Sequence, residues 1–412
     1  MAKKTVADIN VKGKRVLMRC DFNVPLDEDR NITSDARIVK ALPTIRHILD
    51  HGGSVILMSH LGRPKGQPDE AFSLAPVAKR LGELLGRDVL FAEDCIGPDV
   101  EAKAKALNPG HVMLLENVRF HKEETIKDKA AKEDDQLRQA KDAFAKQIAA
   151  LGDVYVDDAF GTAHRDNASM YTVPMMMEGK DRVIGFLIEK ELRFLGQAVS
   201  DPERPFVAIL GGAKVSDKIG VIENLLRKVD TILIGGAMAY TFFKAQGHQV
   251  GDSLCEEDFL SQATSLLKQA QDVGCKIVLP ADTVVANEFK AGATHKVVEG
   301  DIDEGWQGMD IGPKTRDLFA KELAGAKTIV WNGPMGVFEM PPFDEGTKAV
   351  ALAVAEATGK GAVSVIGGGD SASAIINMGL EDKVSHISTG GGASLEFLEG
   401  KTFKCLEILD EK

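Results

Sequence analysis

The sequence predicts an α/β protein built on open parallel sheets, and two observations support that fold class. Short β-rich runs alternate with longer segments of helical periodicity along the chain. Most of the β-rich runs are almost continuously apolar, as parallel strands are when helices cover both faces of their sheet. Such alternation predicts right-handed crossover connections. The length of 412 residues favours two or three domains over one.

Ten apolar runs are expected to be strands. They are 15–21, 54–59, 112–117 and 153–157 in the first half, and 206–210, 231–234, 276–279, 328–331, 362–366 and 384–387 in the second. Helical periodicity lies between them, at 73–85, 131–150 and 348–357. A further helix at 184–197, followed by a segment bracketed by Pro202 and Pro205, is the expected connector between domains. The charged stretch 121–138 holds few apolar residues, so we expect a solvated loop and helix face there.

Isolated arginine and histidine residues stand where apolar runs of the first half end. They occur in five segments, 18–25, 34–37, 59–64, 116–120 and 161–165. In open parallel sheets ligands bind beyond the carboxyl ends of strands, and the planar fork of arginine grips phosphate or carboxylate bidentately. One such arginine could be a surface ion pair, but five corresponding motifs indicate a site for a compact, highly charged anion. Asp21 and Asn23 could receive a substrate hydroxyl there, or orient the arginines.

Apolar runs of the second half end instead in glycine, at 211–214, 235–236, 332–334, 367–370 and 390–392. Glycine lets the main chain approach phosphate closely, which suits a nucleotide held by backbone N–H groups. Lys214 and Lys218 are four residues apart, so on the expected helix start they would share a face and form an anion site. The alternative is a pair of solvated lysines after a tight turn.

A second junction of strand, glycine and helix is expected at 365–371. Asp370 or Ser371 could cap the helix there. Asp370 could instead hold Mg²⁺, because Mg²⁺ takes few carboxylates and keeps water molecules beside phosphate oxygens. An anion site and a nucleotide site in one chain suggest that a group passes between them.

Composition and missing motifs exclude several classes of protein. A net charge of −12 argues against nonspecific nucleic-acid binding, and no apolar stretch is long enough to span a bilayer. Five scattered cysteines without a C-x-x-C pair predict a reduced, cytoplasmic protein without structural zinc. The chain has no Walker A loop or dinucleotide fingerprint. His164-Arg165-Asp166 is similar to a protein-kinase catalytic loop, but Tyr171 stands where that motif needs asparagine.

Nine of these motifs, in their order along the chain, resemble those of the phosphoglycerate kinase family. They are 21–25, 34–37, 59–64, 116–120, 158–165, 211–218, 331–334, 367–370 and 388–392. The resemblance implies two Rossmann-like domains, each a parallel open sheet with helices on both faces, joined by an interdomain helix and hinge. Residues 1–183 would bind the triose, 184–200 would form the interdomain helix, and 201–392 would bind the nucleotide. Residues 393–412 would pack back on the first domain.

The resemblance also assigns roles to residues, with Arg37 and Lys214 as the catalytic pair. The triose site would consist of Asp21, Asn23, Arg37, His60, Arg63, Arg119 and Arg165. The nucleotide site would consist of Lys214, Lys218, Gly235, Gly236, Gly312, Asn332, Pro334, Val337, Glu339, Gly367, Gly368, Gly369, Asp370 and Ser371. Asp370 would be the Mg²⁺ ligand. Ser371 stands where many relatives have threonine, and Met335 where many have valine.

The implied activity is the reversible glycolytic reaction of ATP with 3-phosphoglycerate to give ADP and 1,3-bisphosphoglycerate, by in-line transfer after domain closure. The substrates are then 3-phosphoglycerate and Mg-ATP or Mg-ADP. We expect a cytoplasmic monomer without nucleic-acid or membrane partners. A non-catalytic nucleotide sensor on the same fold is the rival from another class, and loss of the phosphate-gripping side chains would favour it. A dehydrogenase is a second rival, disfavoured by the missing dinucleotide fingerprint.

Overall fold

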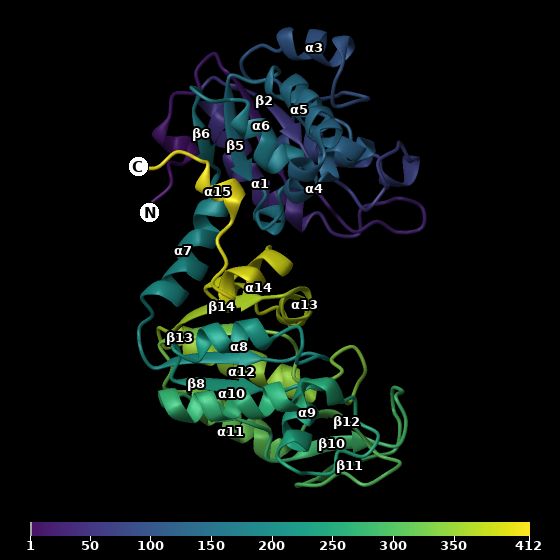
Figure 1. Ribbon diagram of the computed structural model, residues 1–412, viewed down its shortest axis with the longest axis vertical. Coiled ribbons are helices and arrows are strands. Elements are labelled where there is room, and N and C mark those ends of the chain that lie inside the picture. Colours follow the sequence, from purple (N-terminus) through teal and green to yellow (C-terminus); the bar gives the residue numbers. More distant parts are fainter. Residues whose placement is uncertain (1) are drawn as a thin grey trace. The chain divides into compact units, whose positions relative to one another are not determined.

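The computed structural model describes residues 2–412, which divide into two compact units (Figure 1). The first comprises the chain up to Leu192 together with Thr402–Lys412, and the second comprises Arg193–Lys401. Each unit has a six-stranded sheet in which all neighbouring strands are parallel. The α/β fold class predicted from the sequence is therefore confirmed.

The sheet of the first unit has the strand order β3-β4-β2-β1-β5-β6. Its strands are β1 (Arg15–Cys20), β2 (Ser54–Met58), β3 (Val89–Phe91), β4 (Val112–Leu114), β5 (Val154–Asp158) and β6 (Arg182–Ile184). Its helices are α1 (Ala36–Asp50), α2 (Ala75–Leu85), α3 (Pro98–Lys105), α4 (Asp128–Glu133), α5 (Asp135–Ala149), α6 (Val173–Met175) and α15 (Lys404–Glu407). Apolar residues of α1 and α2 pack on one face of the sheet. Alternate strand residues such as Leu17 and Ile56 are also fully buried, and Figure 1 shows α5 and α6 in front of the strands.

The sheet of the second unit has the strand order β15-β14-β13-β7-β8-β9. Its strands are β7 (Phe206–Leu210), β8 (Thr231–Ile234), β9 (Lys276–Val278), β13 (Thr328–Asn332), β14 (Val363–Gly367) and β15 (His386–Ile387). Its helices are α8 (Ile219–Leu225), α9 (Met238–Ala245), α10 (Leu260–Val273), α11 (Pro313–Leu323), α12 (Glu345–Gly359), α13 (Gly369–Asn377) and α14 (Gly392–Leu398). Apolar residues of α11 and α12 form the core on one face. A separate antiparallel sheet has the order β11-β10-β12, from β10 (Thr283–Ala286), β11 (His295–Val298) and β12 (Gln307–Ile311).

Both parallel sheets contain a point where neighbouring strands lead in opposite directions. In the first sheet β1 leads to β2 on one side, whereas its neighbour β5 leads to β6 on the other. In the second sheet the neighbours β7 and β13 lead to β8 and β14 in the same divergent way. Connections that diverge leave a crevice at the carboxyl ends of the two strands, and ligands bind there in open α/β sheets.

The structure differs from the expected pattern in several strands, in one helix and in the burial of the charged segment. The strands β3 and β6 and the antiparallel sheet were not predicted. The helix expected at 131–150 is interrupted at Asp134, whose extended backbone (φ −135°, ψ 111°) ends α4 and whose side chain caps α5. The charged stretch 121–138 is not a purely solvated surface, because the Glu124 side chain within it is fully buried.

The connector and the C-terminal tail divide between the two units. The boundary between units falls inside α7 (Phe186–Ser200), the helix expected as connector. In the tail, Lys4 N donates to Asp410 O at 2.9 Å within the first unit. However, α14 packs on α8 in the second unit, where Asn224 Nδ2 donates to Leu398 O at 2.6 Å. The tail expected on the first domain from residue 393 thus lies in the first unit only from Thr402. The functional domain boundaries stay a prediction.

Candidate active site

Asp21 and Arg37 form an ion pair beyond the end of β1. Asp21 is the first residue after the strand, and Arg37 is the second residue of α1. Arg37 Nη1 donates to Asp21 Oδ2, and the Asp21 side chain is only 9% exposed. Although burial acts in the opposite direction, the positive charges around Asp21, among them Arg37 and Arg19, lower the pKa of its carboxyl. Asp21 is therefore an ionised acceptor that holds the Arg37 guanidinium at the crevice.

Asn23 and His60 shape the same crevice. Asn23 Oδ1 accepts from Gly62 N at 2.8 Å, which fixes the loop that carries Arg63. His60 follows β2 and is 4% exposed. Burial lowers the pKa of His60 well below its usual value, and the positive charges of Arg19 and Arg119 act in the same direction. The ring is therefore neutral at neutral pH and can exchange a hydrogen bond with a ligand without adding charge.

Arg119 and Arg165 carry buried N–H groups that find no acceptor within residues 2–412. Arg119 is 8% exposed and donates from Nη1 to Gly62 O at 2.8 Å, but its Nε has no partner, and neither has Nε of Arg165. Burial, reinforced by Arg19 and Arg165, lowers the pKa of Arg119 to about 10. Unpaired buried donors are costly, and an anion between the guanidinium groups would satisfy them. Arg63 lies exposed on the neighbouring loop.

Arg19 is a further member of this group that was absent from the predicted site. It is fully buried, donates from Nε to Ser169 Oγ at 2.9 Å, and places Nη2 3.3 Å from His60 Nδ1. Ser169 Oγ in turn donates to Glu124 Oε1 at 2.7 Å. The sequence does hold a signal, because a charged residue inside an otherwise apolar strand must have a partner or a ligand.

A second site is a cavity of about 720 Å³ at the carboxyl ends of β7, β13 and β14. Eight of the predicted nucleotide residues line it: Lys214, Lys218, Asn332, Pro334, Gly368, Gly369, Asp370 and Ser371. Six others are not among its lining residues: Gly235, Gly236, Gly312, Val337, Glu339 and Gly367. The cavity thus brings together the two lysines, Asn332 and Asp370 with Pro334, which the resemblance assigns to the adenine pocket.

The glycines around this cavity fall into two groups, those packed closely against another backbone segment and those that face open space. A Cβ on Gly211 would lie 2.1 Å from Pro334 O, and one on Gly333 would lie 2.2 Å from Gly211 O, so these two are required by close packing of the strand ends. Gly212 has a φ of +107°, and a Cβ there or on Gly369 would meet nothing within 4 Å. The open space beside Gly212 and Gly369 leaves their backbone accessible to a ligand.

Lys218 and Lys214 lie in different surroundings. Lys218 is 8% exposed and its Nζ donates to Asn332 Oδ1, whereas Lys214 is exposed. Burial lowers the pKa of Lys218 to about 8, although Asp217 and Asp370 act against it. The prediction that both lysines share a helix face is wrong, because the chain forms turns up to Lys218 and α8 begins only at Ile219. The turn nevertheless places both on the wall of one cavity.

Comparison with known proteins identifies the family of this chain. The family model of phosphoglycerate kinase matches residues 6–401. The phosphoglycerate kinases of Chlorobaculum tepidum and Chlorobium limicola are 56% and 54% identical over 412 residues, covering the whole of each chain. The chain belongs to the phosphoglycerate kinase family. Among solved structures, the phosphoglycerate kinase from Coxiella burnetii matches with a TM-score of 0.86 at 41% identity, and that from Pyrococcus horikoshii OT3 with 0.82 at 33%, each covering 98% of both chains.

Asp370, the predicted Mg²⁺ ligand, lies on the wall of the cavity of about 720 Å³. The helix α13 begins after Gly368, and neither Asp370 nor Ser371 caps it, since Ser371 Oγ instead accepts from Gly333 N at 2.7 Å. The carboxylate of Asp370 is exposed on the cavity wall and has no hydrogen bond or ion pair to any residue from 2 to 412. Beside backbone N–H groups and two lysines, a free carboxylate fits a cation that bridges it to phosphate.

The residues that the phosphoglycerate kinase resemblance assigns to the nucleoside are spread over neighbouring loops. Gly236 follows β8 and donates from N to Met335 O at 2.9 Å. Gly312 precedes α11, where a Cβ would meet the Asp282 carboxyl. Val337 packs against a small core of Val284, Ala286, Ala293, Met309 and Phe343. Glu339 is exposed. Their roles stay a prediction.

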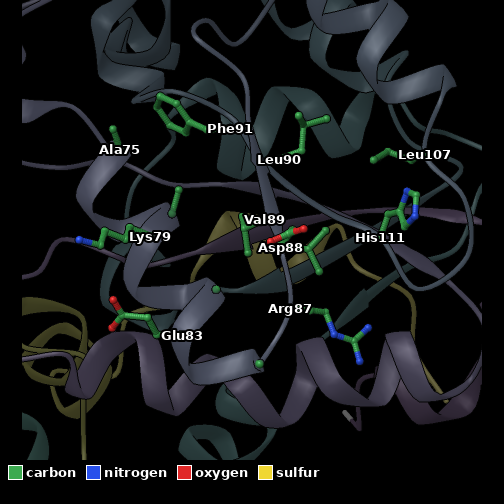
Figure 2. Close-up of a pocket in the computed structure, with 14 residues that line it drawn as sticks. Ala75, Lys79, Glu83, Arg87, Asp88, Val89, Leu90, Phe91, Leu107 and His111 are labelled. Carbon is green, nitrogen blue, oxygen red and sulfur yellow. The ribbon is translucent and has the colours of Figure 1, made fainter.

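A larger cavity, of about 990 Å³, lies between α2 and β3 and contains none of the predicted site residues (Figure 2). Lys79, Glu83, Arg87, Asp88 and His111 stand around it with mixed charge. No side chain lining it has a buried polar atom without a partner.

Within residues 2–412, no helix is both long and apolar enough to cross a membrane.

Proposed function

We infer that the protein catalyses reversible phosphoryl transfer between ATP and the carboxylate of 3-phosphoglycerate, giving ADP and 1,3-bisphosphoglycerate. It is a glycolytic kinase. One observation carries the inference, namely that two different ligand sites occur in one chain. The first is a cluster of guanidinium groups after β1, β4 and β5, in which Arg119 and Arg165 keep buried N–H donors without an acceptor, and the second is a cavity at β7 and β13 lined by glycine and lysine. Each lies where its sheet favours ligand binding.

In the first site, the arginines bind the acceptor and Asp21 orients it. The partnerless N–H groups of Arg119 and Arg165 suit the phosphate of 3-phosphoglycerate, together with the exposed Arg63. Asp21 and Asn23 offer oxygen atoms to its hydroxyl group. The reacting carboxylate is already ionised at neutral pH, so the reaction needs no general base. Arg37, held by Asp21, is the group that stabilises charge on the transferring phosphoryl from this side.

In the second site, Lys218, Asn332 and the open glycine backbone bind the phosphates of the nucleotide. Asn332 Nδ2 is buried without a partner while its Oδ1 accepts from Lys218, so this amide also has a donor to give a phosphate. Lys214, exposed at the cavity, acts on the transferring phosphoryl. Asp370 would hold Mg²⁺, which supplies positive charge to the phosphate oxygens when bound.

The two sites belong to different compact units, so in-line transfer requires the units to close around both substrates. Closure excludes water, which would otherwise accept the phosphoryl group. We further propose that the protein works as a monomer in the cytoplasm. The structure pairs none of its five cysteines in a disulfide, which supports that compartment.

The site assignment can be tested by calorimetric titration of each substrate separately. Arg63→Ala should weaken binding of 3-phosphoglycerate by at least about tenfold, because a charge-assisted hydrogen bond contributes roughly 1.5–3 kcal/mol. Binding of Mg-ADP should not change. Arg138→Ala removes another exposed arginine, on α5, and should alter neither. Unchanged 3-phosphoglycerate binding in Arg63→Ala, or an equal loss for both ligands, would contradict the assignment.

A further inference from the structure

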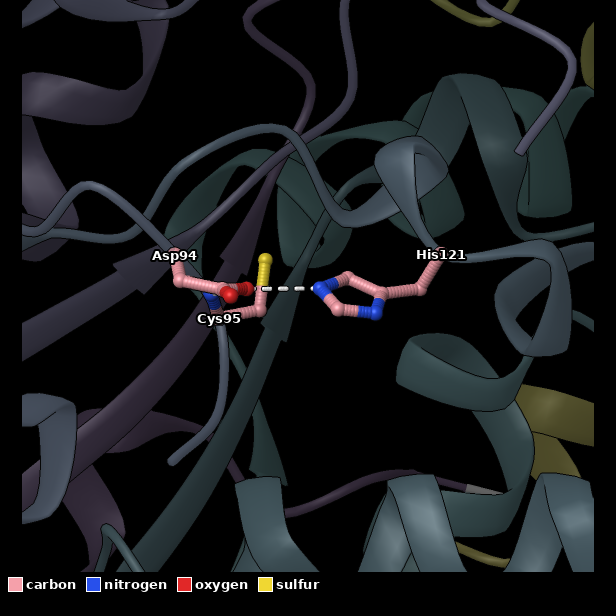
Figure 3. A group of neighbouring side chains, drawn as sticks. All are labelled: Asp94, Cys95 and His121. Carbon is pink, nitrogen blue, oxygen red and sulfur yellow. Dashed lines mark hydrogen bonds and ion pairs between the residues drawn. The ribbon is translucent and has the colours of Figure 1, made fainter. Parts of the chain in front are cut away.

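Three potential metal ligands of different chemical types meet in the first unit, apart from the triose site (Figure 3). Asp94 and Cys95 lie in the loop between β3 and α3, and His121 follows the 3₁₀ turn Val118–Phe120. His121 Nε2 is 2.6 Å from Asp94 Oδ1, and one ligand atom from each of the three residues lies within 4.8 Å of the others. The sequence did not signal the group, because His121 is 26 positions from Cys95 and no metal-binding spacing links them.

The surroundings of the group favour a cation. Asp94 and His121 line a cavity of about 440 Å³ whose other charged lining residues are all acidic: Asp69, Glu70, Glu93 and Glu116. Of the described residues on its wall, none is lysine or arginine. The His121 ring packs on Phe144 with its centroid 5.0 Å away, which limits its rotation and keeps Nε2 toward Asp94.

The donor set selects the class of metal. Sulfur and imidazole nitrogen are poor ligands for Mg²⁺ and Ca²⁺, which prefer oxygen, but are the usual ligands of Zn²⁺ and its neighbours in the first transition row. We propose that Asp94, Cys95 and His121 form a binding site for a divalent ion of the zinc type, with a fourth position open to the acidic cavity. Three protein ligands and one open position form a common tetrahedral arrangement for this ion.

Binding would require small local changes. The Cys95 thiol is 1% exposed and donates to Glu116 O at 2.9 Å, and burial raises its pKa well above the usual value. A metal would replace the thiol proton of Cys95, which is released to solvent. At His121 the metal would take the place of the Nε2 proton that faces Asp94, and the neutral ring would carry its proton on Nδ1 instead. Asp94 is 53% exposed, and its Oδ1 accepts from Cys95 N at 2.6 Å, so the carboxylate is already held beside Cys95 and His121. The site does not depend on the proposed catalytic function.

Cobalt(II) is the probe that tests the proposal, since it replaces zinc and reports thiolate ligation by a charge-transfer absorption in the near ultraviolet. The full-length protein is freed of metal with a chelator, reduced, and titrated with Co²⁺. We expect one ion per chain with a thiolate charge-transfer band, displaced by Zn²⁺ but not by Mg²⁺. Cys95→Ala should abolish the band. Cys255→Ala removes a more accessible thiol in the second unit and should leave the band unchanged.

A second variant keeps the test decisive if Cys95→Ala does not fold. His121→Gln retains a hydrogen-bond donor for Asp94 but loses the imidazole ligand. It should weaken Co²⁺ binding by more than the roughly 10- to 100-fold that loss of an outer hydrogen-bond partner costs. The proposal is overturned if the natural protein shows no thiolate band, if the band disappears in Cys255→Ala, or if His121→Gln binds Co²⁺ as tightly as the natural protein.

Discussion

Lys218 is a buried ammonium group whose charge changes within about one pH unit of neutrality. Its pKa is lowered to about 8, chiefly by burial, so the free protein loses this proton as the pH rises through 8. Phosphate binds the charged form, and nucleotide affinity should therefore fall above pH 8, approaching about tenfold per pH unit. Calorimetric titration of ADP across this range measures the effect. Lys218→Arg stays charged and should flatten the profile; an identical profile in both proteins would contradict the role of Lys218.

The proposed role of Asp370 as a Mg²⁺ ligand can be tested by one substitution. Asp370→Asn should weaken binding of Mg-ADP, because the carboxylate that faces the cation is lost. Binding of ADP in EDTA should weaken less or improve, because a negative charge beside the phosphates is removed. Titration of both proteins with and without Mg²⁺ separates the two effects. Equal losses under both conditions would exclude Asp370 as a metal ligand.

At the residue scale, strand ends could be predicted from the sequence more accurately than the contacts that individual side chains make. It predicted that basic residues gather beyond β1, β2 and β5, because parallel strands end at one edge of a sheet. It could not predict that Arg19 joins them, because its partner Ser169 is 150 positions away. It also misplaced Lys214 and Lys218 on a helix face, because spacing alone does not show where a helix begins.

At the scale of elements, the charged segment 121–138 contributes a buried hydrogen-bond acceptor, Glu124, beside the triose site. Glu124 accepts from Ser169 N at 2.8 Å, from Ser169 Oγ at 2.7 Å and from Asn167 Nδ2 at 3.2 Å. Through Ser169 it also orients Arg19. The sequence predicted a solvated surface here, because a run of charges gives no sign of which one turns inward.

Glu124→Ala should lower the free energy of unfolding of the first unit by about 3–5 kcal/mol. It leaves three buried donors without their acceptor, namely Ser169 N, Ser169 Oγ and Asn167 Nδ2, at roughly 1–3 kcal/mol each. Urea unfolding followed by circular dichroism measures the loss. Glu133→Ala removes an exposed glutamate from α4 and should change stability by less than about 0.5 kcal/mol. Equal free energies of unfolding for the two variants would show that the hydrogen bonds of Glu124 do not stabilise the first unit.

The parallel strands were easier to predict than the other elements. All ten expected runs contain a strand, because burial on both faces makes such strands continuously apolar. In contrast, β11 is largely exposed and β3 is only partly buried, so neither has that signature. The helix interruption at Asp134 depends on a local cap, which helical periodicity across 131–150 does not reveal.

At the scale of the whole molecule, the account requires the two units to approach each other when both substrates are bound. Neither substrate alone offers contacts to both sites, so both together should favour a closed form. Small-angle scattering should give a smaller radius of gyration with 3-phosphoglycerate and a non-reactive ATP analogue together than with either ligand alone. The same radius in the free, singly bound and doubly bound protein would count against closure.

Direct transfer between the two sites is the central claim, and phosphorus NMR of the reaction mixture tests it most directly. With Mg²⁺, ATP and 3-phosphoglycerate, the account predicts resonances of ADP and of an acyl phosphate, both absent when 3-phosphoglycerate is left out. Arg37→Ala should bind both substrates yet form these products roughly 10³-fold more slowly, on the scale of other transfer-site arginines. Accumulation of inorganic phosphate at the same rate with and without 3-phosphoglycerate, and no acyl phosphate, would contradict the account.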